Sequence, residues 1–248
     1  MKATNLLSLC AAIFVLTACE KEDNAVTRPV QFTSTTYKSL GGHDDKGKPD
    51  NLLPKDQISP AVSNLITGSL PENKDMRTSN PELLKSKSFE DIAVTQQSDI
   101  FLTFVSHGTI SNYNTIAFYT YPSNQPPKSP KDIKDITYIF PNAGYQTPLQ
   151  SGDKVKIGRF EPGTSVGFVL MQNAWNPTTK TINKDAVHFC ANDILNPEVD
   201  PNLKKHTVLI NYPAENKVLV GFEDMDRTRE DCDHDFNDVV LYATVVKL

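Results

Sequence analysis

The residues best suited to chemistry lie in one acidic loop near the C-terminus, from Glu223 to Asp238. This loop holds eight carboxylates and two arginines, so its formal charge is −6, whereas the charge of the whole chain is −5. Two like charges about 4 Å apart repel by roughly 1 kcal/mol in bulk water, and by several times more near a protein surface. Such a loop is stable only if it spreads into solvent or holds a cation.

The spacing of the ligands favours the cation. Asp233, Asp235 and Asn237 alternate as the oxygen ligands do in the first half of an EF-hand, but Asp238 stands where that motif needs glycine and Thr244 where it needs glutamate. Hard oxygen ligands suit Ca²⁺ better than they suit a soft metal. The sequence therefore predicts a Ca²⁺ site, with a solvated acidic hairpin as the alternative. The predicted ligands are Glu223, Asp224, Asp233, Asp235, Asn237 and Asp238.

The N-terminus has the features of a targeting segment. Lys2 is followed by an apolar run from Leu6 to Leu16, which is too short to span a bilayer as a helix. The run ends in Leu-Thr-Ala-Cys19, the pattern of a bacterial lipobox. We expect cleavage before Cys19, lipid attachment to its sulfur, and an outer-membrane lipoprotein anchored through those acyl chains.

Cys190 and Cys232 are the two cysteines that remain outside this leader. In an oxidising envelope compartment a single pair most simply forms a disulfide, and we expect a Cys190–Cys232 bond. The competing interpretation joins both cysteines with His188 and His234 in a zinc set. One-residue spacings between ligands are unusual for structural zinc.

The elements that must position these side chains are mostly strands. Seventeen prolines and eleven glycines favour many turns, and short apolar or alternating runs separated by turn residues indicate strands from residue 98 onward. Together they predict an all-β, jelly-roll-like antiparallel β-sandwich. The expected strands are Ile100–Val105, Thr115–Tyr121, Ile136–Phe140, Lys154–Phe160, Val166–Met171, Thr207–Tyr212, Val218–Phe222 and Val239–Val246.

Two short helices are expected before these strands. Ser59 with Pro60 provides an N-cap and a first-turn proline, Gly68 ends the helix, and Asn80 with Pro81 opens a second helix in the same way. The expected organisation is a signal peptide over residues 1–18, a polar tether over 19–37, an accessory loop and helical segment over 38–94, and the sandwich over 95–248.

Three other motifs have ordinary explanations. Ser165 stands in a Gly-x-Ser-x-Gly pattern, but the surrounding sequence predicts a strand and not the strand-turn-helix elbow that exposes a catalytic serine. Trp175 follows a predicted core strand, which favours an anchoring ring over a sugar-stacking platform. The turn over residues 44–50 resembles a calcium turn, but Lys46 and Lys48 favour a plain polar loop.

The acidic loop also carries a family resemblance. The stretch GFEDMDRTREDCDHDFNDVVLYATV, residues 221–245, resembles the C-terminal signature of the DUF4114 domain in LruC-type bacterial surface lipoproteins. The resemblance continues in order through upstream segments such as LQSGDKVKIGRF, residues 149–160, and covers roughly residues 95–248. It implies a calcium-associated β-sandwich on a secreted or surface protein, with no established enzymatic reaction.

These observations lead to one functional expectation. Composition is that of an ordinary globular domain, 38% hydrophobic and 22% charged, and no basic patch indicates nucleic-acid binding. We expect a lipid-anchored envelope protein whose calcium-binding sandwich is a non-enzymatic binding or adhesion module for an unknown extracellular glycan or protein. The rival interpretation is a glycan- or ester-directed hydrolase, which would need carboxylates with well-separated pKa values.

Overall fold

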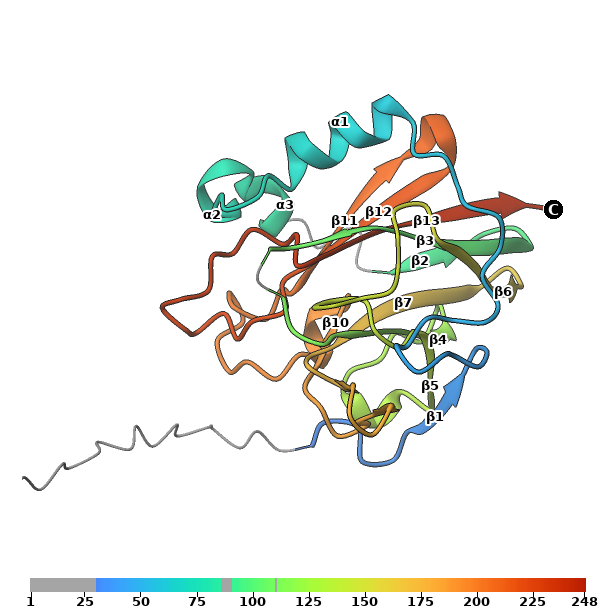
Figure 1. Ribbon diagram of the computed structural model, residues 1–248, viewed down its shortest axis with the longest axis horizontal. Coiled ribbons are helices and arrows are strands. Elements are labelled where there is room, and N and C mark those ends of the chain that lie inside the picture. Colours follow the sequence, from blue (N-terminus) through green and yellow to red (C-terminus); the bar gives the residue numbers. More distant parts are fainter. Residues whose placement is uncertain (1–29, 86–90, 110) are drawn as a thin grey trace, which may run out of the picture.

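The protein folds as two β-sheets stacked face to face (Figure 1). The structure is a computed structural model and describes residues 30–85, 91–109 and 111–248. The chain passes repeatedly from one sheet to the other, and nearly all strand pairs are antiparallel. The prediction of an all-β sandwich is confirmed.

The first sheet has the strand order β1-β5-β4-β7-β10, and β2 also pairs with β7. One pair departs from the antiparallel pattern, because β1 runs parallel to β5. The bounds are β1 (Thr36–Ser39), β2 (Ile92–Val94), β4 (Thr115–Pro122), β5 (Asp135–Phe140), β7 (Thr164–Met171) and β10 (His188–Cys190).

The second sheet is wholly antiparallel, with the order β11-β12-β13-β3-β6. Its strands are β3 (Ser98–His107), β6 (Lys154–Phe160), β11 (Thr207–Tyr212), β12 (Lys217–Phe222) and β13 (Val239–Lys247). A separate two-stranded ribbon pairs β8 (Trp175–Asn176) with β9 (Thr181–Ile182).

The core follows from the alternation of side chains along these strands. On β12, Val218, Val220 and Phe222 face the space between the sheets, while Leu219 faces the opposite way. Phe168 of β7 enters the same central cluster from the first sheet. The outer faces of both sheets carry further apolar clusters, so a strand such as β12 is buried on both sides.

Helices cover the outer face of the second sheet. Figure 1 shows α1 (Pro60–Ser69) lying along that face, near α2 (Met76–Ser79) and α3 (Pro81–Lys85). The hydroxyl of Ser59 accepts a hydrogen bond from the Val62 amide at 3.2 Å, which is the predicted N-cap. Ile66 and Leu70 of this region belong to the outer apolar cluster that also contains Tyr242. Three short 3₁₀ helices are Pro130–Asp132, Asp193–Leu195 and Pro213–Glu215.

All eight predicted strands and both predicted helices are present, with ends that differ by at most two residues. The short strands β1, β2 and β10 and the helix α2 were not predicted. In the predicted tether over residues 19–37, the described part holds the buried Phe32 and the start of β1 at Thr36. The described residues of the predicted accessory segment over 38–94 supply β2 to the first sheet and α1 to the outer face of the second.

The leader and its lipidation residue, Cys19, lie outside the described residues. Within the described ranges, no helix is long and apolar enough to cross a membrane.

One buried carboxyl group lies just before β2 on the first sheet. The hydroxyls of Tyr119 and Tyr121 donate to the two oxygens of Asp91, at 3.1 and 2.7 Å. Burial raises the pKa of Asp91 from 3.8 to about 6, against the lowering effect of these two hydrogen bonds. The folded protein therefore binds this proton more tightly than the unfolded chain does. The stabilisation is complete below about pH 4 and is lost as the pH rises through about 6.

Asp91→Asn should remove this loss, because the amide stays neutral and keeps an oxygen that accepts from a tyrosine. As the pH rises from 4 to 7, the free energy of unfolding of the variant should increase relative to that of the wild type by up to roughly 3 kcal/mol. Urea unfolding across this pH range measures the difference. The exposed Asp45→Asn variant is the control and should follow the wild type, whereas parallel pH curves for Asp91→Asn and wild type would contradict the assignment.

Candidate metal centre

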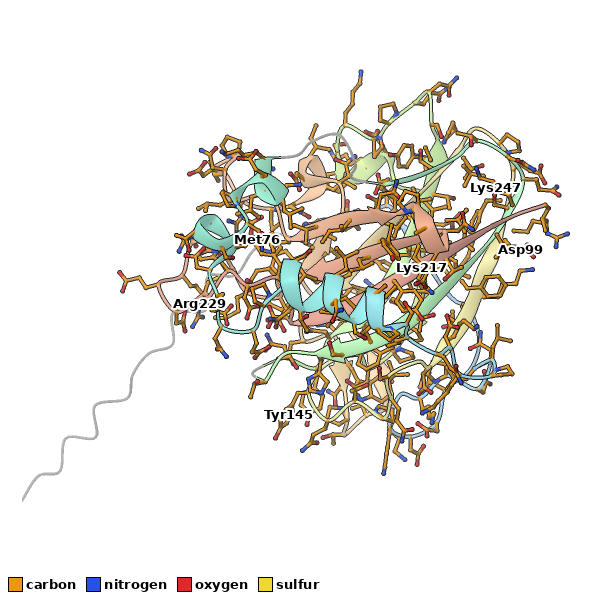
Figure 2. All side chains as sticks on the ribbon, turned by 90° about the horizontal axis from the view of Figure 1, so that it is seen from above. Met76, Asp99, Tyr145, Lys217, Arg229 and Lys247 are labelled. Carbon is orange, nitrogen blue, oxygen red and sulfur yellow. The ribbon has the colours of Figure 1, made fainter. Side chains whose placement is uncertain are left out.

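The acidic loop, residues 223–238, connects β12 to β13 at one end of the second sheet. Phe222 and Val239 are register partners, so the loop begins and ends at one closed pair of strands. Glu223 and Asp224 thus leave one strand where Asp238 enters the other. Figure 2 shows Arg229 of this loop on the same side of the molecule as Met76 of α2, with Asp99 and Lys247 at the opposite end.

Five of the six predicted ligands are buried in the loop, and Asp233 is exposed. Glu223 and Asp224 have no exposed surface. Burial of ionisable oxygens is costly unless they are paired or bind a metal. Most of the predicted ligands are therefore withdrawn from solvent, whereas the tip of the loop, residues 228–231, is exposed.

Three carboxylates converge on one point. Glu223, Asp233 and Asp235 each offer an oxygen, and these oxygens lie within 4.8 Å of one another. Glu223 Oε1 accepts from the Met225 amide at 3.2 Å, but Glu223 Oε2 is buried and has no hydrogen-bond partner among the described residues. Burial and the nearby Asp233 raise the pKa of Glu223 to about 7. A cation between these oxygens would remove both the repulsion and the unpaired acceptor.

The other acidic side chains form a supporting layer. Asp224 accepts from the Asn112 amide at 2.9 Å, from Asn112 Nδ2 at 3.0 Å and from Asn114 Nδ2 at 2.6 Å. Asp238 Oδ2 accepts from the Asp224 amide at 2.8 Å. Burial raises the pKa of both groups, and for Asp238 the nearby Asp224 adds to the effect. These bonds fix the two ends of the loop to each other.

Asp235 both faces the convergence point and holds its own loop. Its two oxygens accept from the Asn73 amide at 2.9 Å and from the Asn237 amide at 3.1 Å. A hollow of about 120 Å³ opens beside it. Its walls are Glu72, Asn73, Gly108, Thr109, Asp233, Asp235, Asn237 and Asp238.

The backbone of the loop adopts an uncommon conformation at two positions. His234 and Phe236 have φ of 57° and 59°, in the left-handed region that non-glycine residues avoid at a cost of order 1 kcal/mol or more each. The Phe236 ring is fully buried under the Arg227 guanidinium, and the His234 carbonyl accepts from the Met76 amide at 2.9 Å. These contacts hold the strained turns.

The structure overturns the predicted Cys190–Cys232 disulfide, since both thiols are free and buried. The alternation along β10 explains the error. Phe189 points into the core between the sheets, so Cys190 points to the outer face of the first sheet, away from the second sheet, whose β12–β13 loop contains Cys232. A pairing inferred from the cysteine count ignores this direction.

The zinc set is not assembled either. His188 Nε2 contacts the Tyr37 hydroxyl at 2.9 Å, on the first sheet, whereas Cys232 Sγ lies 3.3 Å from His234 Nδ1. Cys232 and His234 instead approach Glu223. The Arg227 guanidinium donates to His234 Nδ1 at 3.2 Å, and burial together with this charge lowers the pKa of His234 to about 4. The positive charge of Arg227 beside the imidazole disfavours a metal cation at His234.

The remaining sequence motifs take their ordinary roles. Ser165 is buried within β7 and contacts the Ser123 hydroxyl at 2.9 Å. Trp175 is buried and packs edge-on against His43, so it anchors a loop. Asp44 Oδ1 accepts from the amides of Lys46 and Lys48, the pattern of a polar turn.

Sequence reasoning missed the groups that support the site from far away in the chain. Asn73, Asn112 and Asn114 bond to carboxylates more than a hundred residues distant. No local spacing marks them, although Asn112 and Asn114 are separated by one residue and come just before β4.

The free thiols give a direct test. In the purified protein, Cys190 and Cys232 should resist alkylation while folded, because both are buried, and both should react after denaturation without reductant. Peptide mapping by mass spectrometry distinguishes them from the leader cysteines. Recovery of a disulfide-linked peptide containing Cys190 and Cys232 would contradict the structure.

Comparison with known proteins identifies one domain. Residues 160–245 match DUF4114, a domain of unknown function, and the match includes the whole acidic loop. No curated protein and no solved structure matches the chain. The predicted resemblance to DUF4114 is confirmed for residues 160–245, which run from the end of β6 into β13, and the LruC-type link stays a prediction.

Proposed function

We propose that this protein is a lipid-anchored envelope protein of the LruC type, in which the DUF4114 sandwich binds Ca²⁺ in its acidic loop. The convergence of carboxylate oxygens from Glu223, Asp233 and Asp235 is the observation that carries the calcium assignment, and the unpaired Glu223 Oε2 supports it. The atoms that converge from these three residues are carboxylate oxygens, which suit Ca²⁺, while Cys232 and His234 also lie near Glu223. Asn237 and Asp238 border the adjoining hollow and complete the oxygen-rich surface.

Charge within the loop supports the same assignment. Arg227 donates to the Lys205 carbonyl at 2.8 Å, and its charge attracts that of Glu223. Arg229 pairs with Asp231 at 2.7 Å. One arginine therefore faces three converging carboxylates. A divalent cation would supply the missing positive charge and would keep Glu223 ionised, because it favours the charged form of each ligand.

A binding role fits this centre better than hydrolysis does. An acid–base pair needs a protonated carboxyl that the substrate can reach. Glu223 has the raised pKa, but its side chain has no exposed surface and does not border the adjoining hollow. A substrate would therefore meet Asp233 and Asp235 before it could reach Glu223. We propose a non-enzymatic module in which the ion orders a recognition surface.

Calcium should raise the melting temperature of the purified protein. Extracellular calcium modules bind at roughly 10⁻⁴ to 10⁻³ M, and saturation at about a hundred times the dissociation constant adds roughly 2.7 kcal/mol of stability. For a chain of this size the expected rise is about 5 to 10 °C. Melts in EDTA, in Mg²⁺ and across a calcium series to about 10 mM measure it, and Mg²⁺ should act weakly because it demands tighter octahedral geometry.

Asp233→Ala should abolish this rise. Asp233 is exposed, so the loss of its side chain should leave the calcium-free protein equally stable or more stable. Asp235→Ala is less suitable, because it would also remove the acceptor of the Asn73 and Asn237 amides. Asp231→Ala removes a carboxylate from the same loop outside the convergence point and should keep the full calcium response. Equal melting temperatures in EDTA and calcium would refute the calcium site.

The lipid anchor has its own test. Cys19→Ala should move the protein from the membrane fraction to the soluble fraction, because no acyl chain can then be attached through the sulfur. Metabolic labelling with a palmitate analogue should mark the wild type and not the variant. Unchanged partitioning of the variant would leave the lipobox without its expected role.

A further inference from the structure

One aromatic ring of this protein lies on the surface. Among the Phe, Tyr and Trp side chains that the structure describes, only Tyr145 is exposed, at 48%. It lies in the loop after β5, and Figure 2 shows it on the side of the molecule where Arg229 of the acidic loop lies, with Asp99 and Lys247 at the opposite end. A single exposed apolar group is common on proteins, so the surroundings decide whether this ring serves a ligand.

A hollow of about 280 Å³ lies beside the ring. Tyr113 belongs to its wall and packs edge-on against Tyr145, with the ring centroids 5.3 Å apart. Gln146, the next residue along the chain, belongs to the same wall. The volume is close to the lower end of small-molecule sites, about 300 Å³. The other wall residues with exposed side chains are Asp45, Lys46 and Pro177.

Backbone contacts hold the two tyrosines in place. The Tyr145 amide donates to the Asn112 carbonyl at 2.8 Å, and the Trp175 amide donates to the Tyr113 carbonyl at 2.9 Å. Gly144 permits this close approach of the loops, because a Cβ atom there would lie 1.9 Å from the Asn112 carbonyl oxygen. A site whose parts are fixed before binding loses less conformational entropy when its ligand arrives.

Gln146 offers an accessible hydrogen-bonding group at this site. The Tyr113 hydroxyl donates to Gln146 Oε1 at 2.9 Å, which orients the side-chain amide. Gln146 Nε2 has no acceptor among the described residues, and the side chain is exposed. The backbone of Gln146 has a φ of 53°, and non-glycine residues in this left-handed region gather at ligand sites. A ligand in the hollow can therefore accept a hydrogen bond from Gln146.

Charge indicates which ligand fits. Asp45 and Lys46 both border the hollow with exposed side chains, and Asp45 also pairs with Lys180. A ligand with a net charge of either sign would therefore meet a like charge in the wall. A neutral ligand that both donates and accepts hydrogen bonds can use the carboxylate, the ammonium group and the Gln146 amide. Sugars have this property, and their apolar C–H faces can pack against a tyrosine ring.

We propose that this hollow binds a neutral sugar, whose ring packs against Tyr145 and whose hydroxyls bond to Gln146 and to the charged pair in the wall. The inference rests on the proposed binding role of the module and names its ligand class. Its contacts include none of the candidate metal ligands. The recognised unit is a hexose, deoxyhexose or N-acetylhexosamine within a glycan.

The test is a printed array of neutral and acidic glycans, probed with the purified protein in calcium. We expect binding to glycans that share a neutral sugar, and inhibition by the free methyl glycoside of that sugar. A blank array, or binding to acidic glycans alone, would overturn the sugar site. The calcium melts are read separately, so a failed sugar site and a failed calcium site can be told apart.

Variants of the exposed ring locate the binding. Tyr145→Ala should weaken glycan binding at least about tenfold and leave the calcium melting shift unchanged, whereas Tyr145→Phe keeps the ring and should bind like the wild type. Ile194→Ala is the control, because Ile194 is 50% exposed and lies outside the hollow.

A measurement on the wild type does not depend on how a variant folds. In ¹⁵N-labelled protein, the side-chain amide signals of Gln146 should shift when the methyl glycoside is added. Full binding by Tyr145→Ala, or unmoved Gln146 signals, would overturn the proposal.

Discussion

Repulsion among buried carboxylates is the constraint on which this end of the molecule depends. At the 4.8 Å that bounds the oxygens of Glu223, Asp233 and Asp235, two unit charges repel by about 3 to 4 kcal/mol at an effective dielectric constant of 20. The fold offsets part of this repulsion with amide donors on Asp224 and Asp235. Glu223 Oε2 has no hydrogen-bond donor among the described residues. The charge of this carboxylate can therefore be removed by a proton or balanced by a cation.

The rigidity of the β12–β13 pair makes such an arrangement possible. Phe222 and Val239 are fully buried register partners, and the Phe236 ring inserts into the outer cluster beside Met76. Burying an aromatic ring of this size stabilises a fold by about 2 to 3 kcal/mol. That gain is comparable with the cost of the two left-handed residues, His234 and Phe236. Apolar packing below the loop thus supports an unfavourable arrangement of charge within it.

The sequence predicted those parts of the structure that are encoded locally. Strands such as β6 and β11 have the predicted bounds, because their alternation and flanking turns are visible in a short window. Strands β1 and β10 have four and three residues, and depend on partners that no local pattern indicates, such as the parallel pairing of Thr36 with Asp135.

The same distinction holds at the candidate site. The six predicted ligands of the acidic loop share one stretch of chain, so charge and spacing alone suggested them, and the structure brings together oxygens of three of them, Glu223, Asp233 and Asp235. Asn73 and Asn112 reach the loop only through the folding of the sandwich, and Glu72, which follows α1, borders the hollow beside Asp235 for the same reason. The disulfide was predicted wrongly for a related reason, because the direction of Cys190 depends on which face of β10 turns toward the other sheet.

The hydrogen bonds of Asp224 determine how far binding in the loop can influence the whole domain. Asp224 follows β12 in the second sheet, whereas Asn112 and Asn114 lead into β4 of the first. Asn114 Oδ1 in turn accepts from the Asn173 amide at 3.1 Å, just beyond β7. If the loop were held only by the β12–β13 hairpin, it could open while the rest of the domain stayed folded. A bound ion would then stabilise the protein only against this local opening. Because opening this loop also separates the ends of the two sheets, the free energy of any ion held there contributes to the unfolding of the entire sandwich.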